Sequence, residues 1–149
     1  MKKLLLFISL ISLPLLSGSC SNEPDLSDSR IEYYRYANPT HDTETLIENE
    51  SIRVAIGKPV YLQIRTQSND GSTPRFFGQV DDQQKAELIG GEIPVVATYT
   101  HDDGSYRQIN ELEVFLLPDL YSPGQVISFE TRIGSKSGVL SEKIYLVLK

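Results

Sequence analysis

The sequence predicts an all-β fold, an antiparallel β-sandwich of about seven to eight strands with room for one short helix. Apolar and polar side chains alternate in several segments, a period that turns one face of a strand toward a core and the other toward water. Clusters of Gly, Pro, Asn and Asp, which are typical of tight turns, separate these segments. The chain has one cysteine, so no disulfide within it supports the core. Apolar packing must therefore stabilise the fold.

The expected strands follow one another with turns between most neighbours. Ile52, Val54 and Ile56 give the simplest example, because each is separated from the next by one polar or small residue. The predicted strands cover residues 30–37, 51–56, 60–65, 75–80, 94–100, 111–116, 127–133 and 143–149. The predicted turns cover residues 57–59, 69–71, 102–104, 122–124 and 134–138. Strands with one buried face and one solvent-exposed face are typical of antiparallel sheets.

Only the segment from Asp82 to Ile89 has helical character. Asp82 can cap the first turn of a helix and Gly90 can end it. The segment is long enough for two turns at most.

Two segments suggest how the strands are arranged. The run Val54-x-x-Gly57-Lys58-Pro59-Val60-x-Leu62 resembles the entry to the second strand of many extracellular immunoglobulin-like domains. Residues 125–131, the turn at 134–138 and residues 141–148 resemble the closing hairpin of those domains. The resemblance covers residues 30–149 and implies an immunoglobulin-like β-sandwich. The chain departs from antibody-type domains because it has no cysteine pair and no tryptophan. A small β-barrel is the alternative arrangement.

The first 19 residues have the composition of a signal peptide. Lys2 and Lys3 are followed by a run of 13 mostly apolar residues, Leu4 to Leu16. A helix of that length spans roughly 20 Å, whereas a bilayer core of about 30 Å needs nearer 20 residues. We therefore expect residues 1–19 to be a leader that is removed, and not a membrane span.

Cys20, the only cysteine, follows this leader directly. Ser17-Gly18-Ser19-Cys20 resembles a bacterial lipobox, in which the cysteine is fatty-acylated and becomes the new N-terminus. The departure is Ser17, where an aliphatic residue is usual. The rival interpretation is ordinary leader-peptidase cleavage after Ser19, since Ser17 and Ser19 are both small. Lipidation also accounts for the unpaired cysteine of a secreted chain.

Residues 20–29 form the expected tether, because they are polar, acidic and almost free of apolar side chains. Glu23 and Asp25, soon after Cys20, resemble the surface-export signal of Bacteroidota lipoproteins. A plain solvated linker explains them equally well. The resemblance implies a lipid-anchored protein of the cell envelope, on the periplasmic or surface face of the outer membrane.

The net charge limits the choice of partner. The whole chain carries a formal net charge of −6, and loss of Lys2 and Lys3 with the leader makes the remainder more acidic. This balance disfavours nucleic acid and anionic membrane surfaces as partners.

No motif in the sequence indicates catalysis, a cofactor or a metal. There is neither a Gly-x-Ser-x-Gly elbow nor a His-Glu-x-x-His pair. Glu111 and Glu113 are paired carboxylates, but their alternation with Leu112 and Val114 favours a solvated strand face over a glycosidase pair.

The possible metal ligands around His101 lack the spacing of a calcium-binding loop, and adjacent acids on a turn usually face water. These ligands are Asp81, Asp82, Asp102 and Asp103. His41 is the other histidine. We predict a protein that is not an enzyme.

Eight tyrosines, including Tyr33, Tyr34 and Tyr36 near the first strand, are the remaining candidates for ligand contact. Tyrosine rings stack on sugars or anchor protein partners, although tyrosine also suits half-buried strands. Tyr61 and Tyr145 extend such a patch if their strands adjoin. The sequence therefore favours a non-catalytic module that binds a glycan or an envelope protein. The alternative is an assembly subunit without a soluble ligand.

Overall fold

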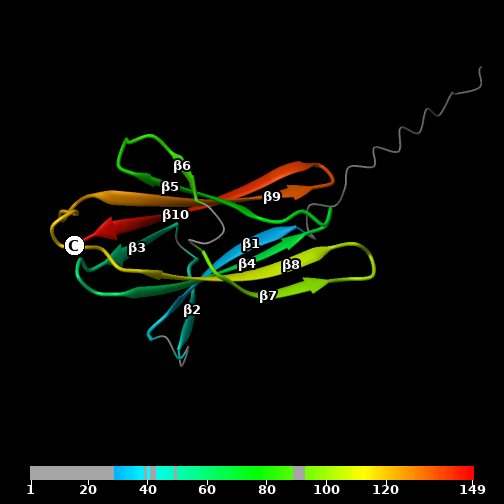
Figure 1. Ribbon diagram of the computed structural model, residues 1–149, viewed down its shortest axis with the longest axis horizontal. Helices are drawn as coiled ribbons and strands as arrows, with labels where there is room; N and C mark the ends of the chain where they lie inside the picture. Colours follow the sequence, from blue (N-terminus) through cyan, green and yellow to red (C-terminus); the bar gives the residue numbers. More distant parts are fainter. Residues whose placement is uncertain (1–28, 39, 41–42, 49, 89–92) are drawn as a thin grey trace, which may run out of the picture.

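The computed structural model describes residues 29–38, 40, 43–48, 50–88 and 93–149, and these residues form two five-stranded β-sheets that pack face to face (Figure 1). The first sheet has the order β2-β1-β4-β8-β7 and the second has the order β3-β10-β9-β5-β6. The first contains β1 (Arg30–Tyr36), β2 (Glu44–Leu46), β4 (Val60–Ser68), β7 (Val95–Thr100) and β8 (Tyr106–Val114). The second contains β3 (Ser51–Val54), β5 (Arg75–Val80), β6 (Ala86–Leu88), β9 (Val126–Ser135) and β10 (Gly138–Leu148).

The all-β prediction is confirmed, and the described residues contain ten strands where seven to eight were expected. The two additional strands, β2 and β6, have three residues each. Such short strands lack the length over which a period of two becomes recognisable.

The helix predicted from Asp82 to Ile89 is wrong over its described part. Asp81 has φ 44°, and its carboxylate accepts a hydrogen bond of 2.9 Å from the Val126 amide, so the chain turns back toward β5. Ala86–Leu88 then pairs with Phe76–Gly78 as an antiparallel edge strand. A segment of two turns forms no stable helix alone, so the hydrogen bonds offered by β5 decide its conformation. Ile89 and Gly90 lie outside the described residues.

The antiparallel prediction holds for every observed pair but one. β3 pairs in parallel with β10, with Ser51 opposite Tyr145 and Val54 opposite Leu148. The other pairs are antiparallel. Parallel pairing needs a long crossover and cannot be recognised from local alternation.

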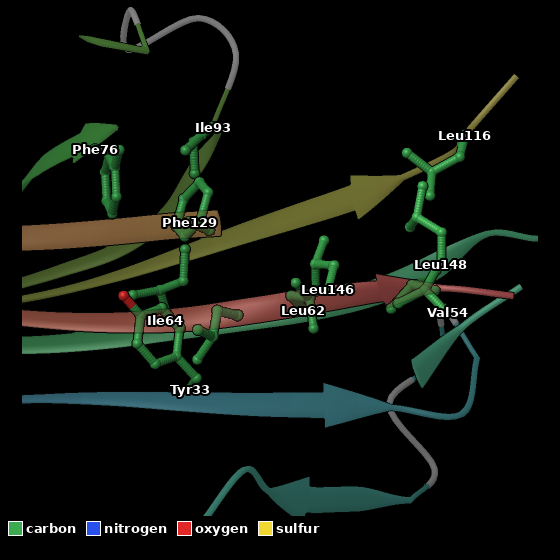
Figure 2. Close-up of a cluster of buried hydrophobic side chains, with 12 residues drawn as sticks. Tyr33, Val54, Leu62, Ile64, Phe76, Ile93, Leu116, Phe129, Leu146 and Leu148 are labelled. Atoms are coloured by element: carbon green, nitrogen blue, oxygen red, sulfur yellow. The ribbon is translucent and has the colours of Figure 1, made fainter. Parts of the chain in front are cut away.

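The core lies between the sheets and is apolar (Figure 2). Tyr33 from the first sheet meets Phe129 from the second edge to face, with ring centroids 6.3 Å apart. Phe129 stacks on Phe76 at 5.9 Å. Aliphatic residues from both sheets extend the core toward the C-terminal end of β10: Leu62, Ile64, Val54, Leu146 and Leu148.

One end of the sandwich is closed by a hydrogen-bonded loop that explains a misplaced turn. Gly134 was expected to begin the last turn, but β9 continues through it to Ser135. The Gly134 amide donates to Ser72 Oγ at 2.8 Å, and its carbonyl oxygen accepts from Ser68 Oγ at 2.9 Å. A Cβ at residue 134 would lie 2.5 Å from Asp70 Oδ2, so only glycine allows this approach without a shift. The Ser68 hydroxyl also lowers the pKa of Asp70 by hydrogen bonding.

Candidate functional site

The three predicted tyrosines do not share one face. Tyr33 points into the core, where it is 5% exposed. Its hydroxyl lies 2.7 Å from Thr131 Oγ1 and 3.0 Å from the main-chain oxygen of Glu142, so it links the two sheets. Burial raises the pKa of Tyr33 far above its ordinary value. This tyrosine therefore belongs to the core and presents no ring to a ligand.

Tyr34 and Tyr36 lie on the outer face of the first sheet, held by Arg65 of the neighbouring strand β4. The Arg65 guanidinium lies 4.0 Å from the centre of the Tyr34 ring and donates to the Tyr36 hydroxyl at 3.3 Å. It also pairs with Glu44 of β2 at 2.9 Å. Tyr36 is buried by this arrangement, and burial raises its pKa. Tyr34 stays partly accessible, with its orientation fixed by the cation.

The same outer face continues across β4 to β8. Tyr61 is the register partner of Tyr36 on one side and of Glu113 on the other. Gln63 accepts from Arg65 Nε at 2.6 Å and donates to Glu111 at 2.8 Å, so a chain of polar contacts crosses three strands. We call the outer surface formed by Tyr34, Tyr61, Gln63, Arg65 and Glu111 the tyrosine face.

The tyrosine face contains a shallow hollow of about 270 Å³. Tyr61, Glu111, Glu113, Pro94 and Val96 are among its lining residues. An aromatic ring beside fixed carboxylate and amide groups can stack on an apolar ring face and accept hydrogen bonds from hydroxyl groups. Glu111 and Glu113 thus lie on the solvated strand face that their alternation predicted.

Tyr145 does not extend this face, because β10 belongs to the second sheet and its outer side points the opposite way. There the most distinctive feature is Phe77, whose ring has three cations near it. The charged groups of Arg132, Lys85 and Arg75 lie 4.6, 4.9 and 5.6 Å from the ring centroid. Cations gathered on an aromatic ring gain from its quadrupole.

Carboxylates balance this cation cluster. Glu130, whose side chain is 7% exposed, pairs with Lys85 and Arg132 and accepts a hydrogen bond of 2.7 Å from Ser141 Oγ. Glu87 and Arg75 pair through two contacts of 2.7 and 2.8 Å. The cations are engaged within the sheet, so we assign the cluster a stabilising role.

His101, Asp102 and Asp103, whose side chains are of the types that bind metals, lie in the exposed turn between β7 and β8. The Ser105 amide donates to Asp103 Oδ1 at 2.9 Å and lowers the pKa of Asp103. Among the described residues, no group of three or more His, Cys, Asp or Glu is placed to hold a metal ion. His41 lies outside the described residues.

The leader 1–19, Cys20 and most of the tether 20–29 also lie outside the described residues, which begin at Ser29. Within the described part of the chain, no helix has the length and apolar character needed to cross a membrane.

Sequence reasoning found the tyrosines but missed the side chains that organise them. In the sequence, Arg65 and Gln63 show only the alternation expected of the solvent-facing positions of a strand. Their contacts with Tyr34 and Glu111 depend on which strands are neighbours. No protein-family model matches this chain, and no curated protein gives a significant match.

Proposed function

We propose that this chain is a non-catalytic binding module of the cell envelope that binds a glycan at the tyrosine face. The observation that supports this most is a hollow on the outer face of the sheet, lined by Tyr61, Glu111 and Glu113. Gln63, which accepts a hydrogen bond from Arg65, donates one to Glu111 and so holds that carboxylate in place. Side chains that are already held in place lose little conformational entropy when a ligand binds. The ring of Tyr61 would stack on a sugar, and Glu111 and Glu113 would accept hydrogen bonds from its hydroxyls.

The strand order supports an immunoglobulin-like arrangement for this module. The N-terminal part of the domain divides between the sheets, since β1 pairs with β4 whereas β3 pairs with β10. In this proposal the orders β1-β4-β8-β7 and β10-β9-β5-β6 would be the two layers of an immunoglobulin-like sandwich. The additional strand β2 carries Glu44, which contacts Arg65.

The first prediction concerns the glycan. We expect the protein to bind a subset of immobilised glycans on an array, and we expect Tyr61→Ala to weaken that binding about tenfold, which corresponds to ~1.4 kcal/mol. Tyr34→Ala should weaken it less, because Arg65 already covers part of that ring. Tyr145→Ala, on the opposite sheet, is the matched control and should bind as the unaltered protein does. Equal losses in all three variants, or no binding to any glycan, would contradict the proposal.

The second prediction concerns the anchor. A lipid on Cys20 would hold the module at a membrane with residues 21–29 as a spacer. We expect the unaltered protein to sediment with membranes and the Cys20→Ala variant to be released. Ser21→Ala serves as the control and should remain bound. Mass spectrometry of the mature N-terminus should show an acylated cysteine, and an unmodified Cys20 would refute this part of the proposal.

An assembly subunit without a soluble ligand is the second candidate, and one observation favours it. Phe115, Leu117 and Leu120, in the loop between β8 and β9, are 51%, 49% and 69% exposed. Three large apolar side chains exposed in a single loop offer a surface on which another protein can dock. Failure of glycan binding, together with co-purification of one partner that is lost in Leu120→Ser, would favour assembly.

A further inference from the structure

A pocket of about 330 Å³ lies between the two sheets, in the size range of small-molecule sites. Its wall is formed mainly by aliphatic side chains from both sheets: Leu62, Leu88, Leu112, Val114, Ile127 and Leu146. The exposed residues Gln83, Gln84 and Ala86 lie at its rim, so it opens to solvent beside β6. Among the described residues that line it, none is charged.

Gly78 is one of the residues that line this pocket. It occupies the middle of β5, on the same side of the strand as the buried Phe76. Its register partners are Ala86 on β6 and Phe129 on β9, so two small residues lie side by side where the core would otherwise continue. Glycine weakens a strand interior, and its presence there often marks a close approach by a ligand.

A Cβ at residue 78 would fit without strain. The three atoms nearest to it would all belong to the Leu88 side chain, at 3.6 to 3.8 Å, which is ordinary van der Waals contact. Neither a positive φ nor a close backbone contact requires glycine at this position. Packing alone would therefore favour a larger residue at position 78. The presence of glycine there, and of the pocket beside it, needs a reason other than core packing.

We infer that this pocket binds a single alkyl chain of a free fatty acid or lipid. The wall is mainly aliphatic, with Phe129 and Tyr121 as its aromatic members, and such a surface matches a hydrocarbon. A charged group would find no counter-charge inside, so the polar end of the ligand must stay at the rim. There the amides of Gln83 and Gln84 offer neutral hydrogen-bond donors and acceptors. The inference does not depend on the glycan proposal, because the tyrosine face lies on the outer side of the first sheet.

Titration of the full chain with dansyl-undecanoic acid tests the inference by fluorescence. We expect saturable binding that dodecanoate displaces. Gly78→Val should weaken probe binding at least tenfold while leaving the melting temperature unchanged or raised, because the added methyl groups fill the pocket from a strand that tolerates valine. Ser128→Val adds the same side chain on the outer side of β9 and should bind the probe normally. Residues 1–19 are common to all these chains, so differences between them report on the pocket.

If Gly78→Val fails to fold, Gly78→Ala tests the pocket instead, because the atoms nearest to its Cβ lie at ordinary contact distances. It should fold and bind the probe about threefold more weakly. A folded Gly78 variant that binds as tightly as the unaltered chain would overturn the inference. Displacement of the probe by naphthalene more readily than by dodecanoate would overturn the assignment to an alkyl chain.

Discussion

Replacing Phe129 with alanine should destabilise the domain by about 3–5 kcal/mol, the usual cost of truncating a buried phenylalanine. Phe129 is 5% exposed and contacts an aromatic ring from each sheet, Tyr33 and Phe76. The substitution removes both ring contacts and enlarges the pocket that Phe129 already lines. Because small domains are stable by only 5–15 kcal/mol, the loss should be visible as a large fall in the urea midpoint.

The matched control for this substitution is Phe115→Ala. Phe115 is 51% exposed, so the same change removes little buried area and should shift the free energy of unfolding by less than about 0.5 kcal/mol. Urea unfolding of both variants, followed by tyrosine fluorescence, gives the comparison. Similar losses at the two positions would show that the sheets do not pack through Phe129.

Glu130→Ala should give the second large loss, about 2 kcal/mol. The carboxylate is almost fully buried and is the shared partner of Lys85 and Arg132. Removal of the Glu130 carboxylate leaves these cations close to each other. They also stay close to Lys143, which lies opposite residue 130 on β10. Removing one partner of a fully buried pair costs about 3–5 kcal/mol, but Lys85 and Arg132 are 29% and 43% exposed, so water offsets part of the loss.

Ionic strength separates this electrostatic effect from a packing effect. The deficit of Glu130→Ala should shrink as salt is raised, because salt screens repulsion between partly exposed cations. Glu130→Gln keeps the side-chain volume and should still lose stability. The control Glu142→Ala removes an exposed carboxylate and should change the free energy of unfolding by less than about 0.5 kcal/mol. A deficit that does not change with salt would argue against the charge network.

Two strands were predicted at or close to their observed bounds. β5 lies at residues 75–80 as predicted, and β1 ends one residue early at Tyr36. The segments β2 and β6 were missed, since their conformation depends on the strand beside them. Ala86–Leu88 is the clearest case, because its local sequence favours a helix and the edge of β5 makes it a strand.

The candidate site was found only in part. The sequence identified tyrosines near the first strand, but alternation along one strand cannot say which face is the core. Register placed Tyr33 inside and brought Tyr34 beside Gln63 of β4. The division of the strands between two sheets separated Tyr61 on β4 from Tyr145 on β10.

The sequence by itself determined the all-β class, the positions of most turns and the absence of a disulfide within the chain. These follow from local periodicity and composition, which act over a few residues. Only the tertiary structure decided which strands are neighbours, and hence the parallel contact of β3 with β10, the contacts of Arg65 and the pocket beside Gly78. The physical reason is that strand pairing and sheet packing join residues far apart in the chain, so their energies depend on a partner that no local pattern identifies.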